Sequence, residues 1–191
     1  MLGLVSSEPR IDSFVGDAIT VDLIVKAAAG QTVGQARFGD AVFRCALGRS
    51  GMLPDKVEGD GGTPTGSFAP RRVLFRHDRM KLIETPLPHR ALALDDGWCD
   101  DPDDWNYNRQ VSLPYRASHE KMWREDHLYD IVVVIGHNDD PIVRGKGSAV
   151  FLHLAHHDYA PTEGCIAFET GDLIQILAGL RAQDRVIVAL T

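Results

Sequence analysis

Cys165 and His153 are the two residues whose types and spacing point most directly to chemistry. Cys165 follows a Pro-Thr-Glu-Gly turn, and His153 stands twelve positions earlier in an otherwise apolar stretch. A nucleophilic thiol needs exposure, a lowered pKa and an oriented base. A histidine on a strand beside the turn can take the thiol proton, and backbone N–H groups of a glycine-containing turn can stabilise an oxyanion. The pair therefore predicts nucleophilic catalysis by a cysteine.

Each of these residues also has a purely structural interpretation. A histidine on an apolar strand can be a core residue with satisfied hydrogen bonds, and a lone cysteine can be a small buried hydrophobe. The glycine-rich stretch Lys56–Phe68 can likewise be an ordinary turn between two strands. It lacks the Gly-Lys-Ser/Thr ending of a phosphate-binding loop.

A metal site is a third hypothesis, because four histidines and three aspartates cluster downstream of position 136. His153 and His156 converge only on a helix, and in an extended strand they face opposite sides. The strand pattern is the stronger one here, so the sequence favours a site without metal or any other cofactor. The residues of this hypothesis are His137, His153, His156, His157, Asp139, Asp140 and Asp158.

The elements that must position the pair are mostly strands, because short β-branched apolar runs alternate with Gly and Pro turn signals. One helix is expected, with Thr170 as its N-cap and apolar residues at 173, 176, 177 and 180. The expected strands are Thr20–Lys26, Ala36–Phe38, Ala41–Leu47, Arg72–Phe75, Ile131–Ile135, Ala149–Leu154 and Arg185–Leu190.

The segment Leu94–Tyr115 has neither helical nor strand periodicity and carries six aspartates. It is expected to be a long surface loop, and such loops often form lids or walls of sites. Its Asp95, Asp96, Trp98 and Trp105 are candidates for one wall of a cleft or for a solvated acidic loop. Ser118–Asp126 is expected to be a short helix capped by its serine.

Composition limits the classes of function. The chain has 191 residues, 44% of them apolar and 25% charged, which is typical of one globular domain spanning residues 1–191. The net charge of −7 argues against a nucleic-acid partner, and the apolar runs are too short for a membrane segment. Met1–Arg10 does not have the pattern of a secretory signal. Three cysteines make an odd count, so at least one thiol is free or shared.

Two strings of this chain resemble the signature of the L,D-transpeptidase catalytic domain, the YkuD-like family. That signature is a Thr-Pro-x-Gly-x-Phe turn, then a histidine on a strand, a loop and Ser/Thr-His-Gly-Cys. Thr63–Phe68 and Phe151–Ile166 follow the same order, and the resemblance covers about residues 35 to 190. A stand-alone branch of the family is similar in three further strings, Ala46–Gly51, Asp95–Asp100 and Ala160–Cys165.

The resemblance implies a mainly β fold, a curved L,D-transpeptidase-like β-sandwich with one or two short helices. It implies an acyl-transferase that acts on peptidoglycan stem peptides through a thioester. Cys165 matches the nucleophile, His153 the base, and Gly164 the glycine whose backbone shapes the oxyanion site. Thr162 matches the Ser/Thr of the motif and is a candidate for binding the substrate, and His137 is a candidate for binding or supporting it.

Three departures from the family pattern concern specificity more than the nucleophile. Glu163 replaces a second histidine and is a further substrate-binding candidate, and the spacing from His153 to Cys165 is short. Ala167 stands where many members have an arginine that binds the substrate's carboxylate. Two alternatives stay open: hydrolysis by the same chemistry, as in an L,D-carboxypeptidase or amidase, and a non-catalytic cell-wall-binding domain. The resemblance implies the cell envelope or periplasm, whereas no signal peptide is visible, so the location stays open; the oligomeric state is not indicated.

Overall fold

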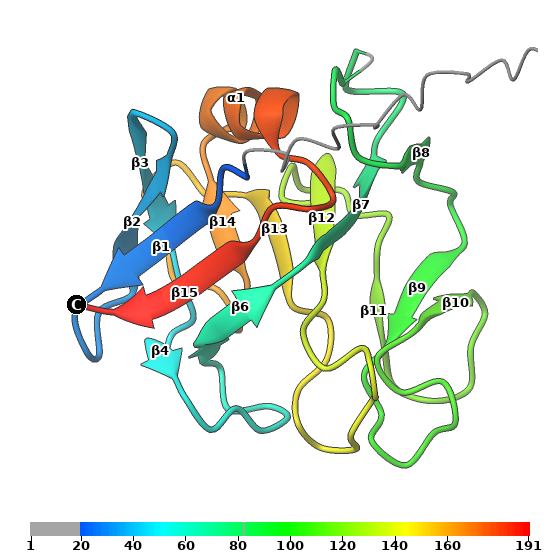
Figure 1. The fold of residues 1–191 in the computed structure, drawn as a ribbon. Helices are drawn as coiled ribbons and strands as arrows, with labels where there is room; N and C mark the ends of the chain where they lie inside the picture. Colours follow the sequence, from blue (N-terminus) through cyan, green and yellow to red (C-terminus); the bar gives the residue numbers. More distant parts are fainter. Residues whose placement is uncertain (1–19, 82) are drawn as a thin grey trace, which may run out of the picture.

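A computed structural model describes residues 20–81 and 83–191, and these residues form a mainly β structure with one short helix (Figure 1). The expected mainly β class is thus confirmed. The expectation about Met1–Arg10 lies outside the described residues. The elements are β1 (Leu23–Ala27), β2 (Val33–Phe38), β3 (Ala41–Ala46), β4 (Met52–Leu53), β5 (Thr63–Pro64), β6 (Gly66–Phe68), β7 (Pro70–Phe75), β8 (His89–Ala91), β9 (Asp96–Cys99), β10 (Gln110–Ser112), β11 (His119–Lys121), β12 (Ile131–Ile135), β13 (Phe151–Leu154), β14 (Ile166–Phe168), α1 (Thr170–Gly179) and β15 (Val186–Leu190).

Ten strands form one curled sheet in the order β6-β15-β1-β2-β3-β14-β13-β12-β7-β8. Most neighbours are antiparallel, but β13 and β14 run parallel, as do β1 with β15 and β7 with β8. The helix α1 packs against one side of this sheet, and β9, β10 and β11 form a small separate sheet beyond β7 (Figure 1). Each of the seven strands expected from the sequence is present, with ends shifted by up to three residues.

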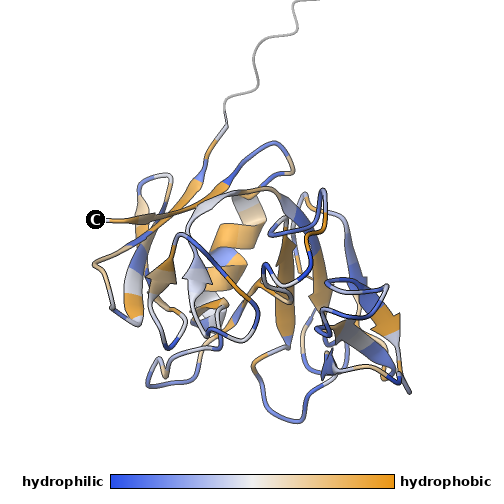
Figure 2. Ribbon diagram, turned by 90° about the horizontal axis from the view of Figure 1, so that it is seen from below, coloured by the Kyte–Doolittle hydropathy of each residue, from blue (hydrophilic) through white to orange (hydrophobic). Residues whose placement is uncertain are grey.

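The middle of the main sheet is buried on both faces. In β12, Ile131, Val133 and Ile135 belong to the core beneath α1, whereas Val132 and Val134 belong to a second core on the other face. Alternation along a strand produces this division, because successive side chains point to opposite faces. Figure 2 shows hydrophobic residues along the central strands and on the helix, with mostly hydrophilic residues in the loops.

The helix buries the apolar face that the spacing predicts, since the side chains of Leu173, Ile176 and Leu177 are fully buried. The expected cap is wrong. Thr170 is the first helical residue, and the N-cap position is Glu169, which makes no side-chain capping hydrogen bond. Burial of the apolar face, rather than capping, therefore accounts for where this helix lies.

The segments expected to be a structureless loop and a helix instead contribute strands. The strand β9 is buried along its whole length and pairs with β10 on one side and β11 on the other. These pairs satisfy its backbone hydrogen bonds in a buried setting, which local periodicity does not reveal. Of the wall candidates, Asp96 is paired with Arg90 at 2.8 Å and Trp98 is buried, whereas Trp105 is 85% exposed.

Replacing Leu177 by alanine tests the burial of α1. L177A should lower the free energy of unfolding by about 2–5 kcal/mol, because it opens a cavity in the core. The matched control is I174A on the same helix, where the side chain is 39% exposed and the loss should be about 0.5 kcal/mol. Urea unfolding measures both, and equal losses would contradict this account of the helix.

Candidate functional site

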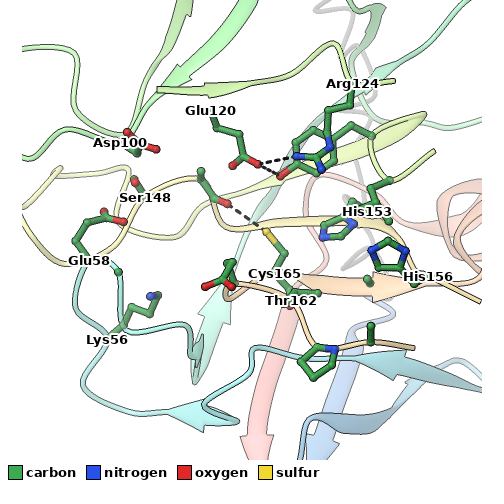
Figure 3. Close-up of a pocket in the computed structure, with 18 residues that line it drawn as sticks. Lys56, Glu58, Asp100, Glu120, Arg124, Ser148, His153, His156, Thr162 and Cys165 are labelled. Atoms are coloured by element: carbon green, nitrogen blue, oxygen red, sulfur yellow. Dashed lines mark hydrogen bonds and ion pairs between the residues drawn. The ribbon is translucent and has the colours of Figure 1, made fainter. Parts of the chain in front are cut away.

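Parallel pairing of β13 with β14 brings Cys165 and His153 to one face of the sheet. Leu152 lies opposite Ile166 and His153 opposite Ala167, and the first two side chains face the core beneath α1. Since alternate residues point to opposite faces, His153 and Cys165 both face the other side. There they line one cavity of about 300 Å³, and Figure 3 shows the imidazole beside the sulfur-bearing strand.

The thiol of Cys165 is held by backbone groups in a buried position. Its Sγ–H donates to the carbonyl oxygen of Ala149 at 3.2 Å, and the N–H of Phe151 donates to the sulfur at 3.3 Å. Burial, together with the negative charge of Glu120, raises the pKa of the thiol to about 12. The exposure and the lowered pKa expected of a nucleophilic thiol are therefore not found, because the sulfur is buried, and the resting group at neutral pH is a thiol and not a thiolate.

A backbone hydrogen bond fixes the tautomer of His153. Its Nδ1 lies 2.8 Å from the carbonyl oxygen of Leu154, and because a carbonyl only accepts, Nδ1 carries the proton. Burial lowers the pKa of His153 to about 4, so the ring is neutral at pH 7 and Nε2 is an unprotonated acceptor. The ring of Tyr129 packs edge-on at a centroid distance of 5.3 Å and restricts its rotation.

The turn before Cys165 is fastened by a threonine hydroxyl. Thr162 Oγ1 donates to the carbonyl oxygen of Cys165 at 2.7 Å and accepts from the N–H of Gly164 at 3.1 Å. Gly164 has a φ of +136°, and a Cβ there would lie 2.9 Å from the backbone oxygen of Gly62. Only glycine fits this backbone without a shift.

Two further loops converge on the same turn. Thr63 Oγ1 donates to the carbonyl oxygen of Cys165 at 3.3 Å and accepts from the N–H of Gly48 at 2.8 Å. The N–H of Arg49 donates to the carbonyl oxygen of Thr162 at 2.8 Å. The strings Ala46–Gly51, Thr63–Phe68 and Ala160–Cys165, which are far apart in sequence, thus form one connected support for the cysteine.

The model of the L,D-transpeptidase catalytic domain family, YkuD, matches residues 23–188. The chain belongs to this family. Members of the family are L,D-transpeptidases and act on peptidoglycan. No curated protein shows significant sequence similarity to the chain.

Among solved structures, L,D-transpeptidase 1 of Mycobacterium tuberculosis is similar at 13% sequence identity, with a TM-score of 0.38. The match covers 90% of this chain and 62% of that protein's chain. The present L,D-transpeptidase domain thus spans less than two thirds of the length of that structure.

Two substitutions set this L,D-transpeptidase domain apart from the family motif. Glu163, at the place of the second histidine, is 80% exposed in its side chain and forms an ion pair with Arg49 at 2.8 Å. It does not pair with His153. Ala167, at the place of the arginine, is buried, and Lys56 and Arg124 are lysine and arginine side chains that line the cavity.

The structure places His137 away from the other site residues. It does not line the cavity of Cys165 but borders a neighbouring one with Trp98 and Phe151. Its Nε2 lies 3.0 Å from the carbonyl oxygen of Lys146, and its ring packs edge-on against Phe68. From this position, His137 does not face the cavity in which a substrate would bind at Cys165.

Several cavity residues were missed by sequence reasoning, and all of them come from loops or from the small sheet. Glu120 accepts a hydrogen bond from Tyr129 Oη at 2.6 Å and lies 3.7 Å from Arg124. Burial raises the pKa of Glu120. Asp100 ends a string that carried the family resemblance, and Lys56 and Glu58 lie in the glycine-rich stretch Lys56–Phe68, but nothing in these segments indicated which side chains face the cysteine. The missed residues are Lys56, Glu58, Asp100, Glu120, Arg124 and Ser148.

The histidines and aspartates of the metal hypothesis do not converge. Within residues 20–81 and 83–191, no three His, Cys, Asp or Glu side chains are grouped so that they could hold a metal ion. Cys45, Cys99 and Cys165 are all buried free thiols. In the same ranges no helix is both long and apolar enough to cross a membrane.

Replacing Gly164 by alanine tests the backbone of the turn. G164A should lower the free energy of unfolding by about 2 kcal/mol or more, because a Cβ is strained at this φ and meets backbone atoms. The matched control is G171A in the first turn of α1, where no atom lies within 4 Å of an added Cβ. G171A should be neutral or slightly stabilising in urea unfolding. Equal changes in the free energy of unfolding for the two variants would contradict the expectation that a Cβ at position 164 is strained.

His153 predicts a distinct dependence of stability on pH. Because its folded pKa of about 4 lies below the unfolded value of 6.5, the unfolded chain binds the extra proton in this interval. The free energy of unfolding should therefore fall by up to about 3 kcal/mol as pH drops from 6.5 to 4. H153Q should lack this part of the loss, whereas H157Q at an exposed position should follow the wild type in urea titrations. If the free energy of unfolding of H153Q fell with pH in parallel with that of the wild type, the assigned role of His153 in this pH dependence would be contradicted.

Proposed function

We propose that this domain catalyses L,D-transpeptidation of peptidoglycan stem peptides through a thioester on Cys165. The sulfur attacks the carbonyl that joins the L-centre of a diamino acid to a terminal D-Ala. A sulfur–carbon bond forms, the peptide bond breaks, and D-Ala leaves as the free amino acid. The amine of a neighbouring stem then attacks the thioester, forms the cross-linking amide and releases the thiol.

The observation that carries this proposal is the fixed tautomer of His153, which faces the same cavity as the thiol of Cys165. Because Nδ1–H is bound to the carbonyl of Leu154, only Nε2 is left to accept the thiol proton. We propose that Nε2 takes this proton during attack and returns it to the amine of the departing D-Ala. With a thiol pKa of about 12 and an imidazole pKa of about 4, the proton is transferred as the sulfur attacks and not in an earlier step.

The remaining site residues are proposed in supporting roles. Gly164 gives the turn the backbone shape that leaves room for a developing oxyanion at Cys165. Thr162 keeps that turn closed through its two hydrogen bonds. Glu163, exposed at the mouth of the cavity, contacts the substrate at the rim. His137 positions the segment ending at Gly147 through the carbonyl of Lys146.

Intact-mass spectrometry with a tetrapeptide stem tests the nucleophile and the base. The wild type should gain the mass of the peptide minus D-Ala, and C165A should gain nothing. H153A should acylate about a hundredfold more slowly or worse, which is the usual loss when a positioned base is removed. C45A and H157A are matched controls and should acylate like the wild type. Acylation of C165A, or an unchanged rate in H153A, would refute the mechanism.

The reaction products show whether the acyl-enzyme is resolved by the amine of a second stem peptide or by water. Cross-linked dimer identifies transpeptidation, and trimmed tripeptide alone identifies hydrolysis as in an L,D-carboxypeptidase. Binding to isolated cell wall without any product or acyl-enzyme would identify a non-catalytic domain and overturn the proposal.

A further inference from the structure

One end of the cavity carries two carboxylates that no cation neutralises. Asp100 and Glu58 both line the cavity of Cys165. In the part of the chain that the structure describes, neither carboxylate forms an ion pair with Lys, Arg or His. Oδ1 of Asp100 is buried and has no hydrogen-bond partner, whereas Glu58 accepts a hydrogen bond from Tyr107 Oη.

A buried hydroxyl beside these carboxylates is also without a partner. Ser148 is only 9% exposed and lines the same cavity, and among the described residues no group lies at full hydrogen-bond distance from its Oγ, although the hydroxyl is near enough to Tyr107 to oppose the rise in the pKa of that phenol. Figure 3 shows Ser148 next to Asp100 and Glu58, on the opposite side of Cys165 from His153 and His156. A buried polar atom without a partner is destabilising, so two of them at one end of a cavity indicate a ligand that supplies N–H groups.

The two cationic side chains that line the cavity, Lys56 and Arg124, are each paired with another carboxylate and form no ion pair with Asp100 or Glu58. Lys56 Nζ is bound to Asp60 Oδ1 at 2.5 Å and to the carbonyl oxygen of Val57 at 3.0 Å. Arg124 is bound to Asp126 at 2.6 Å and lies with His153 on the other side of Cys165 (Figure 3). An anionic ligand would be repelled by the two free carboxylates, and a neutral one would leave them unpaired.

We propose that Asp100, Glu58 and Ser148 form a subsite for a primary ammonium group of the substrate peptide. This assignment rests on the proposed function, in which the donor carries a diamino residue and the acceptor presents an amine. Either amine has the chemistry that the subsite recognises. Two carboxylates and a hydroxyl oxygen match the three N–H donors of one ammonium.

Calorimetric binding to C165A tests the subsite without any chemical step. The ligands are a tetrapeptide stem with a free side-chain amine on its third residue and the same peptide with that amine acetylated. If the donor amine occupies the subsite, D100N in the C165A background should bind the free-amine peptide at least tenfold more weakly than C165A alone, because a charge-assisted hydrogen bond is lost. Both proteins should bind the acetylated peptide equally.

The matched control is D103N in the same background, since Asp103 is an exposed carboxylate outside the cavity. It should leave both affinities unchanged. S148A and E58Q give independent tests at the other two positions, and each should weaken binding of the free-amine peptide severalfold. Unchanged thermal unfolding would show that each variant is folded.

Kinetics on proteins that retain Cys165 then assign the source of the amine. If the tetrapeptide binds more weakly to D100N or acylates it more slowly, the donor amine occupies the subsite. If donor binding and acylation are normal but added amine resolves the acyl-enzyme at least tenfold more slowly, the acceptor amine occupies it. Both results support the subsite.

Three results would contradict the proposed subsite. The first is that D100N changes neither binding, nor acylation, nor aminolysis. The second is that D100N weakens binding of the free-amine and the acetylated peptide equally, and the third is that the peptide does not bind to C165A while D100N shows normal aminolysis. The proposed function fails separately. If the wild type is never acylated while C165A binds the free-amine peptide in an Asp100-dependent manner, the subsite stands and the transpeptidation mechanism falls.

Discussion

The parallel contact between β13 and β14 is the constraint on which the site depends. It places His153 opposite Ala167, which is two residues beyond Cys165, so both side chains lie on the face that does not enter the core under α1. A slip of one residue in either strand would turn one of the two side chains into that core. The apolar residues Leu152, Leu154, Ile166 and Phe168, which are buried under α1, oppose such a slip. Ordinary core packing thus sets the geometry of the chemistry.

Burial has opposite effects on the two reacting groups and leaves both neutral. It raises the pKa of the Cys165 thiol and lowers that of the His153 imidazole. The stable resting state is therefore a thiol beside a neutral base, with no ion pair to desolvate. In the proposed mechanism, no thiolate is present before the substrate binds, and negative charge would develop only as the sulfur attacks a carbonyl. The fastening of the turn by Thr162 and Thr63 matters for this reason, since it keeps the backbone in place before charge appears.

The two ends of the cavity carry different groups. Asp100 and Glu58 lie at one end together with Lys56, which is paired with Asp60. The other end has the neutral His153, His156 and Arg124, which is paired with Asp126 (Figure 3). Glu120 lies between them and is tied to Tyr129. Under the proposed function, the acidic end would receive an ammonium group of the substrate, and this contact would help to decide which carbonyl meets the sulfur.

The sequence by itself determined the long strands, the apolar face of the helix, the Thr-Glu-Gly-Cys turn and the family, because these depend on periodicity and on short motifs. It did not reveal β9, β11 and β14, which are three or four residues long and exist through pairing with distant strands. Only the tertiary structure decided that Glu163 turns outward to Arg49, that His137 lies outside the cavity, and that Glu58, Asp100 and Ser148 meet at its end. Those residues are separated by forty or more positions, and no local pattern encodes a contact that long-range packing creates.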